Sequence, residues 1–367
     1  MILGIDASRA NKKEKTGVEW YSYFLIQEFK TLIPKKIKVR LYSTKPLLPD
    51  LLPLPDNWEA KVLRWPPRIL WTLKRLSWEM LWHKPDILFV PSHILPFFTP
   101  KNTFTTIHDI GFRHFPQSYS WFNRFILNFG LWRAFKSAKK IFTPSEFTKN
   151  ELKSVSKNID KVVITPLGYD DKKYKLQDIS AINSILKKHS IISDYILYVG
   201  RKESKKNILN MIKAFENIKS KIKLVLVGTP GFGYQEIKKY IDSSKIKSNI
   251  LELGWVEEKE LPLLMAGAKI FLYPTLYEGF GIPILEAFAS QVPIITSNNN
   301  STAEVLGDAG LLVDPQNIND IQLAIEKILN NELLSAELTA KGLEQLKKFS
   351  WKNCAEKTLK NMTDVVT

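Results

Sequence analysis

The stretch YPTLYEGFGIPILE, residues 273–286, decides the fold because it joins a predicted strand to a predicted helix through a glycine-containing loop. The apolar run Ile270–Tyr273 is typical of a buried parallel strand. The run Ile282–Ala289 reads as a helix with Pro283 in its first turn, where a missing N–H costs least. Unpaired backbone N–H groups and the positive end of the helix dipole can receive an anion at such a junction.

Two carboxylates, Glu278 and Glu286, flank the glycines Gly279 and Gly281. Glycine lets the backbone come close to a ligand. Glu278 is expected in the loop, where it could contact a transferred sugar, and Glu286 about one turn into the helix, where it could accept hydrogen bonds from a ribose. The competing interpretation makes both of them surface residues, although a Glu inside an otherwise apolar helix weakens it. A phosphate with neighbouring hydroxyls is the ligand that this arrangement suits.

The sequence on either side repeats the strand–helix alternation in two series. Apolar runs predict strands at Ile2–Asp6, Val39–Ser43, Ile87–Val90, Phe104–Ile107, Ile141–Thr143 and Val162–Thr165, and then at Ile196–Val199, Leu224–Val227, Ile250–Leu253, Ile270–Tyr273, Pro293–Thr296 and Leu311–Val313. Helical patterns lie between them, so the predicted class is α/β, with two tandem Rossmann-like, doubly wound parallel-sheet domains. Ligands bind beyond the carboxyl ends of such strands, and the expected site is the cleft between the domains. The polar segment Asp170 to Gln177 is predicted as the linker.

Charge and tryptophan are concentrated in the first half of the chain. The formal net charge is +16, and residues 1–170 carry 27 Lys and Arg against 14 Asp and Glu, together with eight of the ten tryptophans. This composition suits an anionic membrane surface or a lipid-phosphate substrate. No nucleic-acid motif accompanies it, so nucleic acid is not an expected partner. The single cysteine, Cys354, excludes an internal disulfide and a thiolate metal cluster. No signal-peptide or membrane-spanning pattern is found, which favours a cytoplasmic protein.

A cationic loop is predicted after the strand that ends at Val199. Gly200 turns the chain, Arg201 follows, and Lys205 and Lys206 come next. Arg offers a planar fork to phosphate oxygens and Lys a point charge, so these cations could stabilise a diphosphate leaving group in place of a divalent ion. The competing interpretation is a solvated basic loop.

The first half of the chain offers fewer candidate site residues. His108 and Asp109 follow a predicted strand, and His108 could bind an acceptor hydroxyl, lie near a sugar, or be purely structural. His108 and His114 have no clear third ligand, so no metal site is predicted. Gly17 begins a helix after the first strand and could let it approach a sugar or phosphate. No GxGxxG pattern is present, which disfavours a nicotinamide enzyme.

Two further features lie at strand ends in the second half. Trp255, with Val256 beside it, could contact a nucleotide base or simply pack. The run Ser301-Thr302-Ala303-Glu304 matches a capping box and predicts the start of a helix.

The segment from Trp58 to Lys84 is basic and aromatic. Trp71, Trp78 and Trp82 recur at helical spacing after the break at Pro66-Pro67, which predicts an amphipathic helix. Its apolar side could lie on a bilayer with its cations on anionic headgroups, or it could pack on the first sheet.

These motifs together resemble the retaining glycosyltransferases of family 4, which have the GT-B fold. Residues 278–315, EGFGIPILEAFASQVPIITSNNNSTAEVLGDAGLLVDP, are similar to the donor-site signature of that family, and residues 198–215, YVGRKESKKNILNMIKAF, to its diphosphate segment. Residues 4–21, 105–116, 141–152 and 349–351 resemble the bacterial mannosyltransferase-like subgroup.

The resemblance implies a nucleotide-diphosphate-sugar donor on the second domain, residues 169–349. It implies a glycan or lipid-linked acceptor on the first, residues 1–168, to which a final helix in 350–367 crosses back. It assigns Glu286 to the ribose, Glu278 to the sugar, and Arg201 with Lys206 to the diphosphate. Lys205 stays an alternative, because the spacing from Gly200 differs from the usual family pattern.

The resemblance also implies donor contacts from Gly17, Phe280 and Gly281, with His108 near the sugar, and we add Gly279, Trp255 and Val256 as candidate donor contacts. It implies no cofactor and no divalent metal, and transfer with retention in which a phosphate oxygen takes the acceptor proton. The product would be a bacterial cell-surface polysaccharide or lipid-linked glycan, with a mannose-like hexose favoured. Two alternatives stay open: a nucleotide-sugar epimerase or hydrolase on the same fold, and a non-catalytic nucleotide-sugar-binding protein. The expected location is the cytoplasm, with peripheral contact on the inner face of the plasma membrane as an option.

Overall fold

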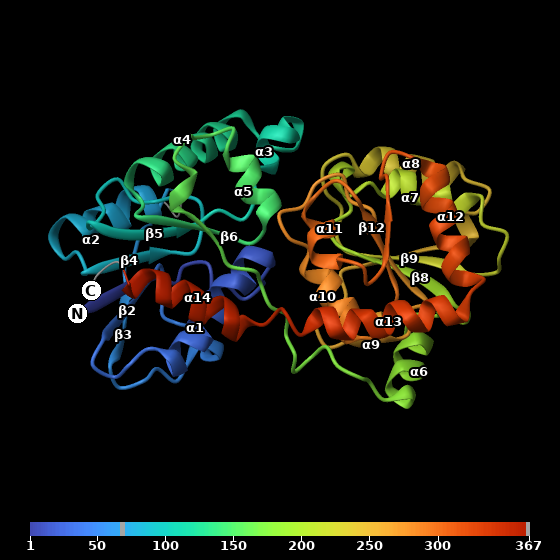
Figure 1. Cartoon of the computed structure of the whole chain (residues 1–367), viewed down its shortest axis with the longest axis horizontal. Helices are drawn as coiled ribbons and strands as arrows, with labels where there is room; N and C mark the ends of the chain where they lie inside the picture. The colour runs from blue at the N-terminus through green and yellow to red at the C-terminus, as the bar shows by residue number, and fades with distance from the viewer. Residues whose placement is uncertain (67–69, 365–367) are drawn as a thin grey trace. The chain divides into compact units, whose positions relative to one another are not determined.

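The computed structural model describes residues 1–66 and 70–364, and the chain folds as two compact units (Figure 1). Unit 1 comprises Met1–Gly168 and Ser350–Thr367, and unit 2 comprises Tyr169–Phe349. Each unit contains one all-parallel sheet with helices on both faces. The predicted α/β class with two tandem doubly wound sheets is therefore confirmed.

Unit 1 contains a seven-stranded sheet in the order β3-β2-β1-β4-β5-β6-β7. Its strands are β1 (Ile2–Asp6), β2 (Lys38–Ser43), β3 (Trp58–Val62), β4 (Ile87–Val90), β5 (Asn102–Thr106), β6 (Lys140–Thr143) and β7 (Val162–Ile164). The strand order reverses beside β1, where Ile5 pairs with Leu41 of β2 on one side and Phe89 of β4 on the other. The carboxyl end of β1 is thus a topological switch point, the place where doubly wound sheets bind ligands.

Helices cover both faces of the unit 1 sheet. They are α1 (Gly17–Leu32), α2 (Ser77–Trp82), α3 (Gly111–His114), α4 (Trp121–Ser137), α5 (Glu146–Leu152) and α14 (Trp351–Thr363). Neighbouring residues of β4 point to opposite faces: Leu88 shares a core with Leu131 of α4, while the ring of Phe89 lies 6.2 Å from that of Phe29 in α1.

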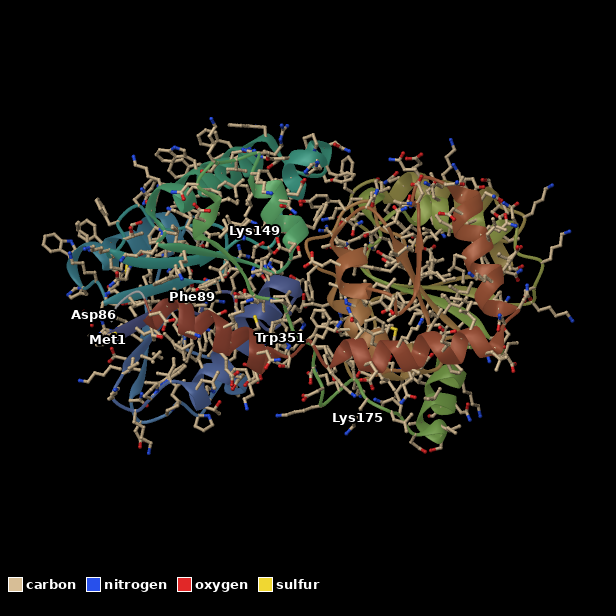
Figure 2. All side chains as sticks on the ribbon, viewed as in Figure 1. Met1, Asp86, Phe89, Lys149, Lys175 and Trp351 are labelled. Carbon is tan, nitrogen blue, oxygen red and sulfur yellow. The ribbon has the colours of Figure 1, made fainter. Side chains whose placement is uncertain are left out.

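The final helix, α14, packs against α1 within unit 1. Trp351, labelled in Figure 2, stacks on Phe24 of α1 with 5.1 Å between the ring centroids. The thiol of Cys354 is buried and donates to the carbonyl of Thr165 at 3.7 Å. Burial raises the pKa of Cys354 to about 12, so this thiol is protonated and structural.

The amphipathic helix predicted after the Pro66-Pro67 break is confirmed from Thr72 to Trp82, where Leu76 and Met80 are buried and Trp78 and Trp82 are exposed. Before that break, Trp58 begins the edge strand β3, which is absent from the predicted strands. Trp71 is buried, a π-helical turn spans Thr72–Leu76, and only the short helix α2 follows. Residues 67–69 of this segment lie outside the described residues. Among residues 1–66 and 70–364, no helix is long and apolar enough to cross a membrane.

Unit 2 contains a six-stranded sheet in the order β10-β9-β8-β11-β12-β13. Its strands are β8 (Tyr195–Val199), β9 (Lys223–Val227), β10 (Ile250–Gly254), β11 (Ile270–Tyr273), β12 (Ile294–Ser297) and β13 (Leu311–Val313). Its helices are α6 (Ile179–Lys188), α7 (Ile208–Glu216), α8 (Tyr234–Ser243), α9 (Leu261–Ala266), α10 (Ile282–Ala289), α11 (Ser301–Leu306), α12 (Ile318–Leu329) and α13 (Glu332–Leu346). In Figure 1, α7 and α8 lie on one face of the sheet, and α9, α10 and α13 on the other.

The central strands β8 and β11 are adjacent, and both are entirely buried. Continuous apolar runs are expected for parallel strands that are covered on both faces. Because all strands run the same way, the loops after β8, β9, β10, β11 and β12 leave from one edge of the sheet. That edge carries the candidate site.

Candidate active site

The loop after β11 is fixed in place by the neighbouring loop after β12. The hydroxyl of Ser301 donates to the carbonyl of Glu278 at 2.6 Å, and the amide of Asn300 donates to the carbonyl of Thr275 at 2.9 Å. Asn300, rather than Ser301, caps α11 by accepting the amide of Thr302 at 3.0 Å. The predicted helix start is confirmed, but the predicted capping box is wrong, because Ser301 is the first helical residue and its hydroxyl holds the Glu278 loop.

The turn from this loop into α10 depends on a glycine. Gly281 is the N-cap residue of α10 and has φ +101°, a conformation that side chains rarely adopt. A Cβ there would also approach Thr302 to 3.2 Å. The helix therefore starts close to the α11 turn, as the opening sequence stretch predicts.

Glu278 and Lys206, two predicted site residues from different loops, are in direct contact. The ammonium of Lys206 forms an ion pair with the carboxylate of Glu278, and the hydroxyl of Tyr273 donates to the same carboxylate oxygen at 2.6 Å. Burial alone would lower the pKa of Lys206, but the attraction of Glu278 outweighs it and the pKa is raised. Lys206 is thus a firmly protonated, partly buried cation, which suits an anionic ligand.

Lys206 is held in this position because the next residue, Asn207, connects three loops. Asn207 is left-handed, with φ +62°, and caps α7. Its side-chain amide donates to the carbonyls of Pro274 at 2.9 Å and of Pro315 at 2.6 Å. These bonds hold the loop after β8 against those after β11 and β13. Asn207 is a structural residue of the site whose role the sequence did not indicate.

The other two predicted cations differ from Lys206. Lys205 lies 3.4 Å from the carboxylate of Glu203, whereas Arg201 is exposed at the end of β8. The backbone beside Arg201 is tightly packed: a Cβ on Gly228 would lie 1.9 Å from the carbonyl oxygen of Gly200. Only glycine fits there, so the ends of β8 and β9 approach closely and leave the Arg201 side chain facing solvent.

Glu286 lies partly buried on the first turns of α10, and its partner comes from the predicted linker. Tyr174 is buried and its hydroxyl is within hydrogen-bonding reach of the Glu286 carboxylate. Burial raises the pKa of Glu286 to about 7; the Tyr174 hydrogen bond and the nearby Lys173 oppose the rise, while Asp170 adds to it. The linker prediction is therefore wrong for this part of the segment, which packs as an integral part of unit 2.

Four further predicted donor-site residues lie in the loops after β11 and β10. The side chain of Phe280 is buried against Phe349, with 5.8 Å between the rings, so only its backbone is available to a ligand. Gly279, beside it, is buried. Trp255 is 65% exposed at the end of β10, while Val256 is buried. The indole of Trp255 can therefore meet a flat aromatic ligand, and Val256 supports the loop.

The predicted site residues of unit 1 lie at the ends of its own strands. His108 is buried, its Nε2 lies 3.3 Å from the carbonyl oxygen of Pro91, and its ring packs edge-on against Tyr21. Burial, together with His93, lowers the pKa of His108 to about 4, so the ring is neutral near pH 7. Gly17 begins α1, and the space where its Cβ would lie is open. A neutral imidazole can hydrogen-bond a hydroxyl but is a poor proton donor.

Comparisons with known proteins identify the family. A model described as "Glycosyl transferases group 1" matches residues 184–345, and one described as "Glycosyltransferase Family 4" matches residues 16–173. The chain is a family 4 glycosyltransferase. It is 31% identical, over 307 residues, to the O-antigen chain mannosyltransferase B of Escherichia coli, a match that covers 82% of this chain and 78% of that protein.

Solved structures of other proteins share the fold of this glycosyltransferase at low sequence identity. The sucrose-phosphate synthase of Thermosynechococcus elongatus superposes with a TM-score of 0.79 at 17% identity, covering 100% of this chain and 99% of that one. The Anabaena protein Alr3699/HepE, solved in complex with UDP and glucose, superposes with a TM-score of 0.75 at 16% identity and 99% coverage of both chains. The predicted GT-B fold is therefore confirmed.

The expectation that the enzyme needs no metal stays a prediction. Within the described parts of the chain, no group of three or more His, Cys, Asp or Glu side chains is arranged to hold a metal ion. Metals bound jointly with substrate phosphates need fewer protein ligands, so an assay has to decide the point.

Proposed function

We propose that this glycosyltransferase moves a hexose, with mannose favoured, from a nucleoside-diphosphate sugar to a glycan or lipid-linked acceptor during bacterial cell-surface polysaccharide synthesis. The observation that carries the proposal is the contact of Lys206 with Glu278 and Tyr273, on the same sheet edge as Arg201 and Glu286. A protonated cation beside carboxylates suits a diphosphate flanked by sugar hydroxyls. The name of the Escherichia coli relative supports mannose and O-antigen synthesis.

We assign the leaving diphosphate to Arg201 and Lys206. As the bond between the anomeric carbon and the diphosphate oxygen breaks, positive charge develops on the sugar and negative charge on the diphosphate, which these cations stabilise. The acceptor hydroxyl attacks from the same face, its oxygen bonds to the anomeric carbon, and its proton passes to a phosphate oxygen. Glu278 is engaged by Lys206 and Tyr273, so its role is to bind and orient rather than to attack. For His108 we assign a hydrogen bond to a sugar hydroxyl.

The donor identity is best tested by thermal-shift screening of the full chain against GDP-, UDP-, dTDP- and ADP-sugars. A ligand that binds only the folded state raises the melting temperature. The expected result is a rise with one nucleotide sugar that persists in EDTA, because the cations replace a metal. A shift that appears only with added Mg²⁺ or Mn²⁺ would refute the metal-free part, and no shift with any nucleotide sugar would refute the donor class.

Donor binding should weaken below about pH 7, because protonation removes an acceptor oxygen of Glu286. In Tyr174→Phe the loss of a hydrogen bond that favours the charged carboxylate should raise the pKa of Glu286 further. The acid limb of the affinity profile should then move to higher pH by about 1 unit, since a hydrogen bond to a charged group contributes roughly 1.5 kcal/mol. Titrations of the donor between about pH 5 and pH 9, a range that covers the acid limb of both proteins, measure this shift.

A matched control for this variant exists on α8. Tyr240 donates to Glu216 at 2.6 Å in the same kind of tyrosine–carboxylate pair, on another helix. Tyr240→Phe should leave the pH profile of donor binding unchanged. Superimposable acid limbs for the wild type and Tyr174→Phe would show that Tyr174 does not act on Glu286. Asp170, Lys173 and Tyr273 also act on this carboxylate and remain unchanged in both variants.

A further part of the proposal is that unit 1 lies on an anionic membrane surface. Exposed aromatic residues from α2, the loop after β4 and α4 are Trp78, Trp82, Phe97, Phe98, Trp121, Phe122, Phe125 and Trp132. Ser77 of α2 accepts the amide of Phe97, and Arg133 of α4 donates to the carbonyl of Phe97, so the three segments form one surface. Lys136 lies over the ring of Trp132. Aromatic side chains interspersed with cations are typical of interfacial membrane contacts.

Flotation with liposomes that contain anionic lipid tests this surface. The wild type should float at low salt, and Trp121→Ser/Phe125→Ser should float much less, because both side chains are more than half exposed on α4. The control, Leu333→Ser, removes an apolar side chain that is even more exposed, at 85%, from α13 of unit 2 and should float like the wild type. A wild-type protein that stays with the soluble fraction at low salt would remove the membrane proposal.

A further inference from the structure

A cavity of about 810 Å³ lies in unit 1 at the carboxyl ends of β1 and β2. It is lined by the loop after β1, the loop after β2, the start of the π-helical turn and Ile94. This is the topological switch point of the unit 1 sheet, where the order of strands reverses. A cavity of this volume can hold a phosphate ester with part of its organic group.

One wall of the cavity is cationic. Arg9, Lys12, Lys13 and Lys45 line it, and Glu14 is the one carboxylate among the described lining residues. Exposed lysines are ordinary on a basic protein, so the wall needs evidence that it is organised.

A buried carboxylate supplies part of that evidence. Glu19, on α1, lies behind the wall and pairs with Lys12 at 2.8 Å and with Arg9 at 3.2 Å. Burial would raise the pKa of Glu19, but Lys12, Thr16 and Arg9 outweigh it and lower the pKa to about 2. Glu19 is therefore charged at every working pH. Its single negative charge balances one of its two partners, Lys12 and Arg9, and leaves one positive charge available to a ligand.

The loop after β2 is held against the loop after β1 by one side chain. The amide of Asn11 donates to the carbonyls of Lys45 at 3.2 Å and Pro46 at 3.0 Å, and its oxygen accepts the amide of Leu48 at 2.8 Å. This three-bond clamp places Lys45 on the same wall as Lys12 and Lys13. The backbone that carries Lys45 is thus positioned before any ligand binds, which reduces the entropy cost of binding.

The opposite wall is apolar. Leu48, Leu70, Trp71, Leu73 and Ile94 line it. The indole N–H of Trp71 donates to the carbonyl of Leu63 at 2.9 Å, so the ring is held in one orientation and presents no unsatisfied donor. A ligand that satisfies both walls carries an anionic group and an apolar group side by side.

We propose that this cavity binds the phosphate or diphosphate ester that links the acceptor to its lipid, with the anion on Lys13 and Lys45 and the first lipid carbons on the Trp71 wall. The inference deepens the proposed function by naming the acceptor class as a lipid-linked phosphate ester. It rests on the proposed function only in calling the bound ester the acceptor. Binding by the cavity can be measured with no sugar transfer at all.

The probes are farnesyl diphosphate, inorganic diphosphate, GDP and the neutral amphiphile octyl glucoside, each titrated by calorimetry into the full chain. Farnesyl diphosphate should bind at least about tenfold more tightly than inorganic diphosphate, because only the ester uses both walls. Octyl glucoside should not bind detectably. Equal affinity for farnesyl diphosphate and inorganic diphosphate would overturn the lipid-ester assignment, and competition between GDP and farnesyl diphosphate would overturn the assignment of the cavity to the acceptor.

The decisive variant is Lys13→Ala/Lys45→Ala, whose two side chains are exposed and whose loss should leave the melting temperature unchanged. It should bind farnesyl diphosphate at least about tenfold more weakly, because two charge-assisted contacts are lost. Lys101→Ala/Lys157→Ala removes the same charge from exposed positions of unit 1 outside the cavity and should bind like the wild type. Equal weakening in both variants would show that the effect depends only on the net charge of the protein, and it would overturn the site.

This test separates the two claims. If the nucleotide-sugar screen fails while farnesyl diphosphate binding depends on Lys13 and Lys45, then the proposed transfer is wrong and the cavity assignment holds. If the screen succeeds while the Lys13→Ala/Lys45→Ala variant binds farnesyl diphosphate like the wild type, the cavity assignment is wrong and the transfer proposal holds.

Discussion

The variant Lys206→Met is expected to transfer sugar at least about a hundredfold more slowly than the wild type, since removing one preorganised group that stabilises transition-state charge costs about 10²–10³ in rate. Lys206 is 12% exposed and is held by Glu278 and Tyr273, so another side chain cannot easily take the place of its ammonium. The loss should fall mainly on kcat, because the charge on the leaving diphosphate grows as the bond breaks. Steady-state kinetics with saturating donor measure it.

Stability has to be separated from catalysis in this variant. Removing Lys206 alone leaves the 16% exposed Glu278 without its counter-ion, which should lower the free energy of unfolding by up to about 3 kcal/mol. The double variant Lys206→Met/Glu278→Gln removes both charges, so it should regain stability without regaining activity. A double variant with near wild-type turnover would show that the pair is structural.

Two further substitutions sharpen the assignment. Lys205→Met should cost less than Lys206→Met, because the ammonium of Lys205 lies beside Glu203, whereas that of Lys206 pairs with Glu278 of the β11 loop. Lys213→Met is the matched control: its ammonium lies over the ring of Tyr240 on α8, so turnover should not change. A larger loss in Lys205→Met than in Lys206→Met would transfer the diphosphate role to Lys205.

The variant Glu286→Gln is expected to weaken donor binding by about 10- to 100-fold at pH 8, since a hydrogen bond to a charged group contributes roughly 1.5–3 kcal/mol. Glutamine keeps the shape of the side chain but offers one acceptor oxygen in place of two. The loss should appear as a higher donor KM and dissociation constant, because the ribose is bound equally in the ground and transition states.

The same variant should be more stable than the wild type at pH 8. Burial raises the pKa of Glu286 from its ordinary value of 4.5 to about 7, so the folded state binds this proton more tightly than the unfolded state. The wild type therefore loses stability as pH rises from about 4.5 to 7, by up to ~3 kcal/mol, and the glutamine variant does not. Denaturant unfolding at pH 5 and pH 8 measures the difference.

Weaker donor binding together with higher stability in Glu286→Gln would identify Glu286 as a functional carboxylate. A functional carboxylate in a site that disfavours its charge destabilises the free protein, which is a common trade-off at binding sites. Glu332→Gln, at the exposed first position of α13, should change neither quantity. Unchanged donor affinity in Glu286→Gln would contradict the ribose assignment.

The sequence predicts the edge of the sheet that carries the site but not the contacts within it. Glu278 and Lys206 follow strands whose carboxyl ends must share an edge in any parallel sheet, so their proximity follows from strand direction alone. That β8 and β11 are neighbours depends on the order of strands, which apolar runs do not encode. Their direct ion pair could therefore be found only in the structure.

Other misses have local causes. Tyr174 lies in a lysine-rich segment whose composition is typical of a linker, yet its ring is buried and its hydroxyl reaches a carboxylate more than 100 positions away. Ser301 matches a capping signature, but Asn300 competes for the same backbone amides and takes the cap. The edge strand β3, Trp58–Val62, is missing from the predicted strands because its run WEAKV carries two charges and its place in the sheet depends on tertiary pairing with β2.

The account's central claim is tested most directly by the anomeric configuration of the product. The full chain would be incubated with the nucleotide sugar that gives the largest thermal shift and a mannose-terminated oligosaccharide, and the new linkage read by NMR. The account predicts release of the nucleoside diphosphate together with a linkage that keeps the donor's anomeric configuration. An inverted linkage, or free sugar or an epimer formed at the same rate without acceptor, would contradict it.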